Sequence, residues 1–175
     1  MKILIIFETG EGQTRKIAEF AAGQIRSAGH QVQLFNAQEK MKPLSFDGID
    51  KVMLAAPVHE RRHPKAFELL VATSLPDLND RPTLLFSVSL KAAFPEGLEE
   101  AQDYLTEMKM RTGLEPDREV LVAGAVRTDS YGYYESQIVK NIALEGQNVE
   151  LVDGVREFTD WDKLGNEISV FLQAD

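Results

Sequence analysis

Five short apolar runs alternate with amphipathic stretches along this chain, and this alternation limits what the chain can fold into. The runs are Ile3–Phe7, Val32–Phe35, Val52–Pro57, Leu84–Val88 and Val120–Ala125. Strands that alternate with helices favour a parallel sheet covered by helices on both faces. The nearly unbroken apolarity of the first, fourth and fifth runs predicts central strands, whereas the alternating second run fits a sheet edge. The pattern predicts an α/β three-layer sandwich whose five-stranded parallel sheet has the order 2-1-3-4-5.

The stretches between the runs predict amphipathic helices that pack on this sheet. Apolar residues three and four positions apart define two buried faces, Ile17, Phe20, Ala21 and Ile25 in one helix and Leu98, Ala101, Leu105 and Met108 in another. Pro64 and Pro95 mark expected helix starts, because proline lacks an N–H that would have no partner there. Thr159 and Asp162 have the spacing of a capping box, so a last helix is expected to start after Thr159.

Length and composition narrow the class of protein further. A chain of 175 residues suits one domain, which we expect to span residues 1–175. It has no cysteine, which excludes disulfides, thiol nucleophiles and thiolate metal sites, and no His/Asp/Glu cluster has metal-ligand spacing, so no metal is expected. The net charge of −9 argues against nucleic-acid binding, and no apolar run is long enough for a membrane segment. These features favour a cytoplasmic protein.

The loop after the first strand is the most informative part of the sequence. In open α/β sheets ligands bind beyond the carboxyl ends of the strands, where the winding direction reverses. This loop leads into a helix N-terminus, where backbone N–H groups and hydroxyls favour a phosphate monoester. Its candidate phosphate ligands are Thr9, Gly10, Glu11, Gly12, Gln13 and Thr14. The alternative is a tight turn and helix cap without a ligand.

At this loop the chain resembles the flavodoxin superfamily and, more narrowly, the bacterial flavodoxin-like, menaquinone-dependent protoporphyrinogen oxidases. The resemblance begins with FETGEGQTRKIA at residues 7–18. It continues with FSVSL at 86–90, PDR at 116–118, AGAVR at 123–127 and FTDWD at 158–162. It implies a flavodoxin-like fold, FMN as cofactor, a porphyrinogen substrate in heme biosynthesis and a quinone as electron acceptor.

The same resemblance implies which residues surround the flavin. Two further loops are expected to frame its ring, formed by Pro57, Val58, His59 and Glu60 and by Ser87, Val88, Ser89 and Leu90. The cofactor would carry the redox chemistry while the protein binds and orients it. No protein nucleophile is required, and the two serines have no evident base partner in the sequence.

Three positions depart from the family pattern. Glu8 stands where the family carries a small hydroxyl residue, and Glu11 would repel a phosphate unless its side chain points to solvent. The loop after the third strand offers no aromatic ring other than imidazole. His59 is the candidate for stacking on the flavin or moving a proton, and its alternative is a solvated loop histidine.

Substrate contacts are expected from two places. Arg61 and Arg62 could meet the propionates of a porphyrin, or flank a helix as solvated charges. Tyr131 and Tyr133 could line a porphyrin or quinone pocket. Two other functions stay open, an electron carrier that meets a redox protein partner and a flavodoxin-like protein that has lost FMN. The sequence does not indicate an oligomeric state.

Overall fold

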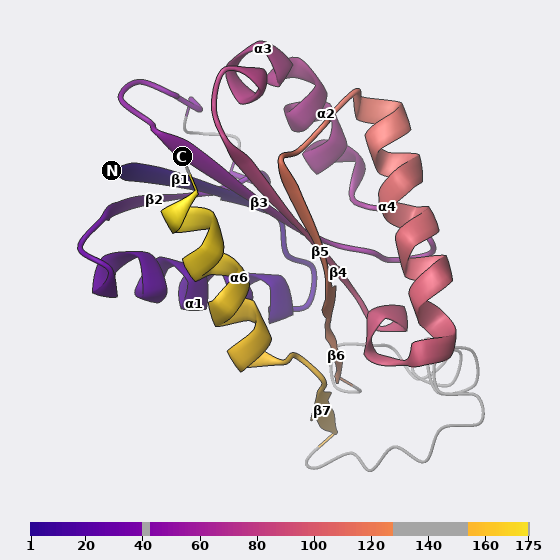
Figure 1. Ribbon diagram of the computed structural model, residues 1–175. Helices are drawn as coiled ribbons and strands as arrows, with labels where there is room; N and C mark the ends of the chain where they lie inside the picture. The colour runs from indigo at the N-terminus through magenta and orange to yellow at the C-terminus, as the bar shows by residue number, and fades with distance from the viewer. Residues whose placement is uncertain (40–42, 128–153, 175) are drawn as a thin grey trace.

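A five-stranded parallel sheet forms the centre of the protein (Figure 1). The computed structural model describes residues 1–39, 43–127 and 154–174. The strands of the sheet are β1 (Lys2–Phe7), β2 (Gln31–Asn36), β3 (Lys51–Pro57), β4 (Thr83–Ser89) and β5 (Arg118–Ala123). Their order is β2-β1-β3-β4-β5, and every pairing is parallel. The predicted fold class and strand order are confirmed.

Helices cover both faces of this sheet. The α-helices are α1 (Gln13–Ser27), α2 (Lys65–Thr73), α3 (Leu75–Asn79), α4 (Leu98–Thr112) and α6 (Trp161–Gln173). Two short 3₁₀ turns, η1 (Lys91–Ala93) and η2 (Pro95–Gly97), link β4 to α4. Helices α1 and α6 pack on one face, and α2, α3 and α4 pack on the other (Figure 1).

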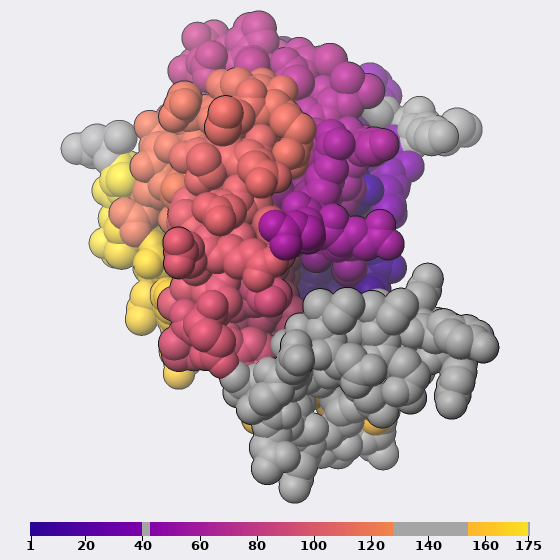
Figure 2. Space-filling model, turned by 90° about the vertical axis from the view of Figure 1, so that its right-hand side faces the viewer, coloured from indigo at the N-terminus to yellow at the C-terminus, as the bar shows by residue number. Residues whose placement is uncertain are grey.

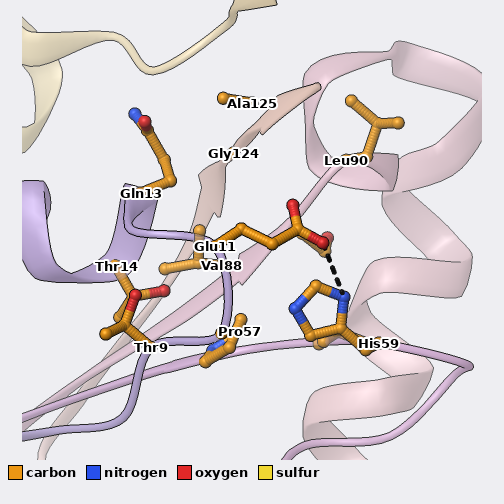
Figure 3. Close-up of a pocket in the computed structure, with 13 residues that line it drawn as sticks. Thr9, Glu11, Gln13, Thr14, Pro57, His59, Val88, Leu90, Gly124 and Ala125 are labelled. Atoms are coloured by element: carbon orange, nitrogen blue, oxygen red, sulfur yellow. Dashed lines mark ion pairs between the residues drawn. The ribbon is translucent and has the colours of Figure 1, made fainter. Parts of the chain in front are cut away.

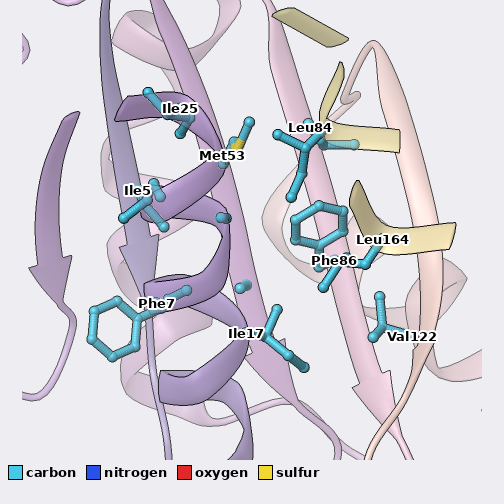
Figure 4. Close-up of a cluster of buried hydrophobic side chains, with 14 of the residues drawn as sticks. Ile5, Phe7, Ile17, Ile25, Met53, Leu84, Phe86, Val122 and Leu164 are labelled. Carbon is cyan, nitrogen blue, oxygen red and sulfur yellow. The ribbon is translucent and has the colours of Figure 1, made fainter. Parts of the chain in front are cut away.

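The core consists of two apolar clusters, one on each face of the sheet. Successive side chains of a strand point to opposite faces, and β1 shows this directly. Ile5 and Phe7 join the cluster under α1 and α6 (Figure 4), whereas Leu4 and Ile6 join the cluster under α2 and α4. Each large apolar side chain buried in this way stabilises the fold by about 1.5–3 kcal/mol relative to an exposed one.

The assignment of 120–125 to a central strand is wrong, because β5 lies at the edge of the sheet and β3 is the central strand. The run is apolar because helices cover both faces of β5: Val120 and Val122 pack into one cluster and Leu121 into the other. The strand also ends earlier than expected. Gly124 donates its backbone N–H to the carbonyl of Ser89 and separates β5 from the next element.

That next element belongs to a small second sheet that the sequence did not predict. Strands β6 (Ala125–Arg127) and β7 (Val155–Glu157) pair antiparallel just beyond the carboxyl end of β5 (Figure 1). The backbone N–H of Phe158 donates to the carbonyl of Gly124, which ties this ribbon to the main sheet. The ribbon therefore reaches the edge where ligands bind in this class of fold.

The helix predictions hold with three corrections. Leu98 is 44% exposed at the start of α4, and Tyr104 takes a buried place on that helix instead. Pro95 begins the 3₁₀ turn η2 rather than α4. The N-cap of α6 is Asp160, whose side chain accepts the N–H of Lys163, so the predicted capping role of Thr159 is wrong.

Candidate functional site

A pocket of about 70 Å³ lies at the carboxyl ends of β1, β3, β4 and β5 (Figure 3). Strand β1 has β2 on one side and β3 on the other, so the winding of the chain reverses here. The pocket is lined by Thr9, Gly10, Glu11, Gln13, Thr14, Pro57, Val58, His59, Val88, Ser89, Leu90, Gly124 and Ala125. The fold thus brings together the three loops that the sequence analysis singled out.

A few residues of the predicted site lie elsewhere, and two others were missed. Gly12, Glu60 and Ser87 do not line the pocket, whereas Gly124 and Ala125 do. These two residues follow the carboxyl end of β5, so the rule that ligands bind at strand ends could have found them. The assignment of the remaining residues to a cofactor stays a prediction.

The loop after β1 has the backbone shape of an anion cradle. Gly12 is the N-cap of α1 and has φ 99°, a left-handed conformation that glycine adopts without steric cost. Its N–H donates to Oγ1 of Thr9 over 3.0 Å, which holds the turn closed. The first N–H groups of α1 have no partner within the helix, and the helix dipole favours negative charge beside them. Thr14, in this first turn, is buried and lines the pocket.

The side chain of Gln13 is committed to other contacts. Its Oε1 accepts from Arg127 over 2.9 Å, and its Nε2 donates to Oγ1 of Thr159 over 3.0 Å and to Glu157 over 3.1 Å. These contacts join the loop after β1 to the ribbon of β6 and β7. Only the backbone of Gln13 is therefore free to bind a phosphate. A phosphate contact through a backbone N–H group would not need the side chain.

Glu11 reaches across the pocket toward His59. Its Oε1 lies 3.8 Å from Nδ1 of His59, and its side chain extends away from Thr9 and Thr14 (Figure 3). The side chain of His59 is 45% exposed. A methyl group on Gly10 would come within 3.3 Å of Nε2 of this histidine, so the glycine allows the imidazole to lie close to the loop. Glu11 thus turns from the anion cradle without pointing to open solvent.

The loop after β3 makes a tight turn that holds His59. The backbones of His59 and Arg62 exchange hydrogen bonds of 3.0 Å in both directions. Between them Glu60 has φ 47° and Arg61 has φ 66°. Two central residues with positive φ are typical of a type I′ turn, a conformation that favours asparagine and glycine. The turn is therefore strained by its own sequence.

Both arginines of this turn form ion pairs. Arg61 contacts Glu100 of α4 at 3.0 Å, and Figure 2 shows this loop, in purple, lying against α4. Arg62 contacts Glu68 at 2.7 Å, and Arg111 contacts the same carboxylate at 2.7 Å. Burial raises the pKa of Glu68, but the hydrogen bonds from the two guanidinium groups outweigh it and hold the pKa below its ordinary value. Neither arginine lines the pocket of Figure 3.

A histidine and a serine form a buried pair beside this loop. Nε2 of His63 lies 2.9 Å from Oγ of Ser87, and both side chains are about 1% exposed. This partner of Ser87 was not evident in the sequence. Burial lowers the pKa of His63 to about 4, so this imidazole is neutral near pH 7. The pair ties the loop after β3 to β4 and is not accessible to a substrate for nucleophilic attack.

The carboxyl group of Glu8 is buried at the end of β1 rather than turned to solvent. The residue is 6% exposed, and its Oε1 accepts a long hydrogen bond of 3.4 Å from Gln38. Burial raises its pKa, and the Gln38 amide and the backbone of Phe67 partly oppose that rise. This departure from the family pattern thus places an acid next to the candidate site.

The remaining predictions concern two tyrosines, metal sites and membrane segments. Tyr131 and Tyr133 lie outside the described residues. Within residues 1–39, 43–127 and 154–174, no three His, Asp or Glu residues group as a metal site. In the same ranges the longest helices, α1 and α4, have 15 residues each, and no helix could span a membrane.

Comparison with known proteins identifies the family. A profile described as a flavodoxin domain matches residues 4–149. The chain belongs to the flavodoxin-domain family. Protoporphyrinogen IX dehydrogenase [quinone] of Escherichia coli strain K12 is 30% identical over 168 residues, which cover 95% of this chain and 92% of that protein. The protein of the same name from Escherichia coli O157:H7 matches equally well. The resemblance found in the sequence is confirmed.

Solved structures show the same fold. Oxidised flavodoxin 1 from Bacillus cereus aligns with a TM-score of 0.58 at 17% identity, covering 100% of this chain and 99% of that one. A flavo di-iron protein from Thermotoga maritima aligns with the same TM-score at 11% identity, covering 98% of this chain but 35% of that one. These structures support the flavodoxin-like architecture of the chain.

Proposed function

We propose that this protein is an FMN-dependent oxidoreductase that oxidises a protoporphyrinogen and passes the electrons to a quinone. The observation that carries the proposal is the similarity to the Escherichia coli dehydrogenase along almost the full length of both chains. The aligned region covers 168 residues, 95% of this chain, and so extends far beyond the loop after β1.

The residues at the strand ends fit FMN in most respects. The backbone around Gly12, with the hydroxyls of Thr9 and Thr14, would hold the phosphate, and the loops after β3 and β4 would flank the ring. When bound, FMN supplies the capacity to accept two electrons that the side chains of this protein lack. His59 is the proposed proton acceptor, because its half-exposed imidazole reaches the pocket.

The pocket is narrow for a flavin ring. Its volume of about 70 Å³ is below the roughly 300–1,000 Å³ of ordinary ligand pockets. Glu11 and His59 span it, so binding would require these two side chains to separate. Both residues belong to loops, and the side chain of His59 is 45% exposed.

The test begins with the cofactor. Purified protein, stripped of flavin, is titrated with FMN and with riboflavin while flavin fluorescence is measured. We expect FMN to bind at least about tenfold more tightly, because one charge-assisted phosphate contact contributes about 1.5–3 kcal/mol. Equal affinity for the two flavins would show that the loop after β1 is no phosphate site.

Activity separates this proposal from an electron carrier. The FMN-loaded protein should oxidise protoporphyrinogen anaerobically with a water-soluble quinone as acceptor. A carrier would instead accept electrons from a flavodoxin reductase and leave protoporphyrinogen unchanged. Failure to bind any flavin would favour the third possibility, a flavodoxin-like protein that has lost FMN, for which the Glu11–His59 contact across the narrow pocket is the supporting observation.

We also propose that the protein works in the cytoplasm. The net charge of −9 would oppose docking on an anionic membrane surface. Fractionation of cells without detergent tests this, and recovery mainly with membranes would contradict it.

A further inference from the structure

A second cleft, of about 380 Å³, lies on the other side of His59 from the proposed flavin pocket. Gly10, Pro57 and His59 line both spaces, so they form the wall between them. The second cleft reaches from the end of β1 to the N-terminus of α2. Its volume falls within the range of about 300–1,000 Å³ that ligand sites usually have.

Two buried polar atoms in the wall of this cleft have no hydrogen-bond partner within the described residues. They are Oε2 of Glu8 and Nδ1 of His63, on side chains that are 6% and 1% exposed. A buried polar atom without a partner costs about 1–3 kcal/mol, so most such atoms are paired by protein, water or ligand. Both atoms belong to residues that line one cleft, and Oε2 of Glu8 is the one that a bound group could complete.

The protein supplies partners to the other atoms of these two residues. Gln38 donates to Oε1 of Glu8, and Ser87 lies 2.9 Å from Nε2 of His63. Nδ1 of His63 and Oε2 of Glu8 stay without a hydrogen bond of ordinary geometry, although the backbone of Phe67 also stabilises the Glu8 carboxylate. This is the arrangement expected of preorganised binding groups.

Charges of both signs line this cleft: Glu8 and Glu60 are negative, and Arg62, which pairs with Glu68, and Lys65 are positive. Lys65 is exposed at the first position of α2, and within the described part of the chain it has no hydrogen bond or ion pair. A cation is unfavourable at a helix N-terminus because the helix dipole is positive there. Lys65 therefore does not stabilise α2 through the helix dipole, whereas it could contact an anionic ligand in the cleft.

We propose that this cleft binds an anionic ring compound that carries N–H groups, with Glu8 accepting from the N–H groups and Lys65 contacting the carboxylates. Resting on the proposed function, the ligand would be a carboxylated porphyrinogen. Its four pyrrole N–H groups can converge on one oxygen at one face of the ring, while its carboxylates lie at the periphery near the rim.

The test measures binding of coproporphyrinogen III, a water-soluble carboxylated porphyrinogen, by anaerobic titration calorimetry. Any bound flavin is kept chemically reduced, so that the ligand is not consumed. Glu8→Gln should weaken binding about tenfold or more, because it replaces a charged acceptor that is buried. Lys65→Ala should weaken binding by roughly two- to fivefold, as expected for an exposed ion pair.

Matched variants separate these effects from general changes in charge. Glu19→Gln, on the exposed side of α1, repeats the charge change of Glu8→Gln far from the cleft. Lys163→Ala, on α6, does the same for Lys65→Ala. Neither should change the affinity. Thermal melting of each variant shows whether it folds, and a Glu8→Asp variant tests the site with a second carboxylate if Glu8→Gln does not fold.

The oxidised ring gives an independent readout. Coproporphyrin III is planar and keeps only two N–H groups, so it should bind the native protein more weakly than coproporphyrinogen, and Glu8→Gln should reduce that difference. Affinities unchanged by Glu8→Gln and Lys65→Ala would overturn the proposal, as would the absence of binding. FMN affinity is measured on the same samples. Binding of coproporphyrinogen that depends on Glu8 in a protein that binds no FMN would contradict the proposed function alone. FMN binding without Glu8-dependent binding of coproporphyrinogen would contradict this inference alone.

Discussion

Nε2 of His63 lies 2.9 Å from Oγ of Ser87 in the interior of the protein. Burial lowers the pKa of this imidazole to about 4 from its ordinary value of 6.5, Glu68 acts in the opposite direction, and Arg111 adds to the lowering. The folded protein therefore holds a neutral histidine over a range of pH in which the unfolded chain is already protonated. This contact joins the loop after β3 to β4, and the protonation of His63 affects the free energy of unfolding of the whole protein.

Protein stability should depend on pH through His63. As pH falls from about 6.5 to about 4, the unfolded state gains a proton that the folded state does not take up, so the free energy of unfolding decreases, by up to about 3 kcal/mol. Below pH 4 both states are protonated and this loss levels off. Urea unfolding at a series of pH values measures it. His63→Gln should remove this part of the slope, whereas His30→Gln should keep it, and equal slopes in both variants would contradict the assignment.

Glycine at position 97 should be essential for the link between η2 and α4. A methyl group there would overlap the backbone carbonyl of Lys91, and backbone atoms cannot move away as a flexible side chain can. We expect Gly97→Ala to destabilise the protein by about 1–3 kcal/mol. Gly23→Ala, in the exposed middle of α1 with open space around it, should stabilise it by about 0.5–1 kcal/mol. Chemical denaturation measures both changes, and a neutral Gly97→Ala would show that the link rearranges freely.

Replacing Arg61 in the turn after β3 by glycine should destabilise the protein less than replacing it by alanine. Arg61 has φ 66°, which costs a residue with a side chain about 1–2 kcal/mol relative to glycine. Both Arg61→Gly and Arg61→Ala remove the ion pair with Glu100, so their difference isolates the backbone. We expect Arg61→Gly to be the more stable of the two by about 1 kcal/mol. Equal unfolding midpoints would show that the turn relaxes when its arginine is removed.

Thr14 should contribute directly to FMN affinity. Thr14→Val removes a buried hydroxyl of the candidate cradle and keeps the shape of the side chain, so binding should weaken by roughly 1–3 kcal/mol. Thr106→Val, on the exposed side of α4, is the control and should bind FMN normally. Fluorescence titration measures both dissociation constants. An unchanged value for Thr14→Val would mean that the threonine serves only the turn.

Glu11 should oppose FMN binding, and its removal should help. Its carboxylate lies in the loop that would hold a phosphate and contacts His59 across the pocket. Glu11→Gln should tighten FMN binding several-fold at low ionic strength and less at high salt, because the repulsion between like charges is screened. Titrations at two salt concentrations test this, with Glu19→Gln as control. Weaker binding in Glu11→Gln would show instead that the Glu11–His59 contact organises the site.

The order of the strands and the position of the phosphate loop could be read from the sequence. Both depend on local signals: alternation of apolar runs and amphipathic stretches, and the short TGEGQT segment at residues 9–14 between a strand and a helix. Topology then places the loops after β1, β3 and β4 at one edge, which needs no knowledge of side-chain packing. For this reason the fold and the location of the candidate site were predictable.

Contacts between residues far apart in the chain were decided by the tertiary structure. Gln13 is held by Arg127, a residue 114 positions away, and His63 by Ser87, 24 positions away. No local pattern indicates such pairs, because each residue alone suits a solvated loop as well as a buried contact. The assignment of 120–125 to a central strand conflicted with the predicted strand order and failed, because apolarity reports that helices cover a strand and not how many strands flank it. The sequence by itself determined the five strands of the main sheet and the strand ends at which a ligand is expected. Only packing decided which polar groups beside those strand ends are paired and which, like Oε2 of Glu8, have no partner among the described residues.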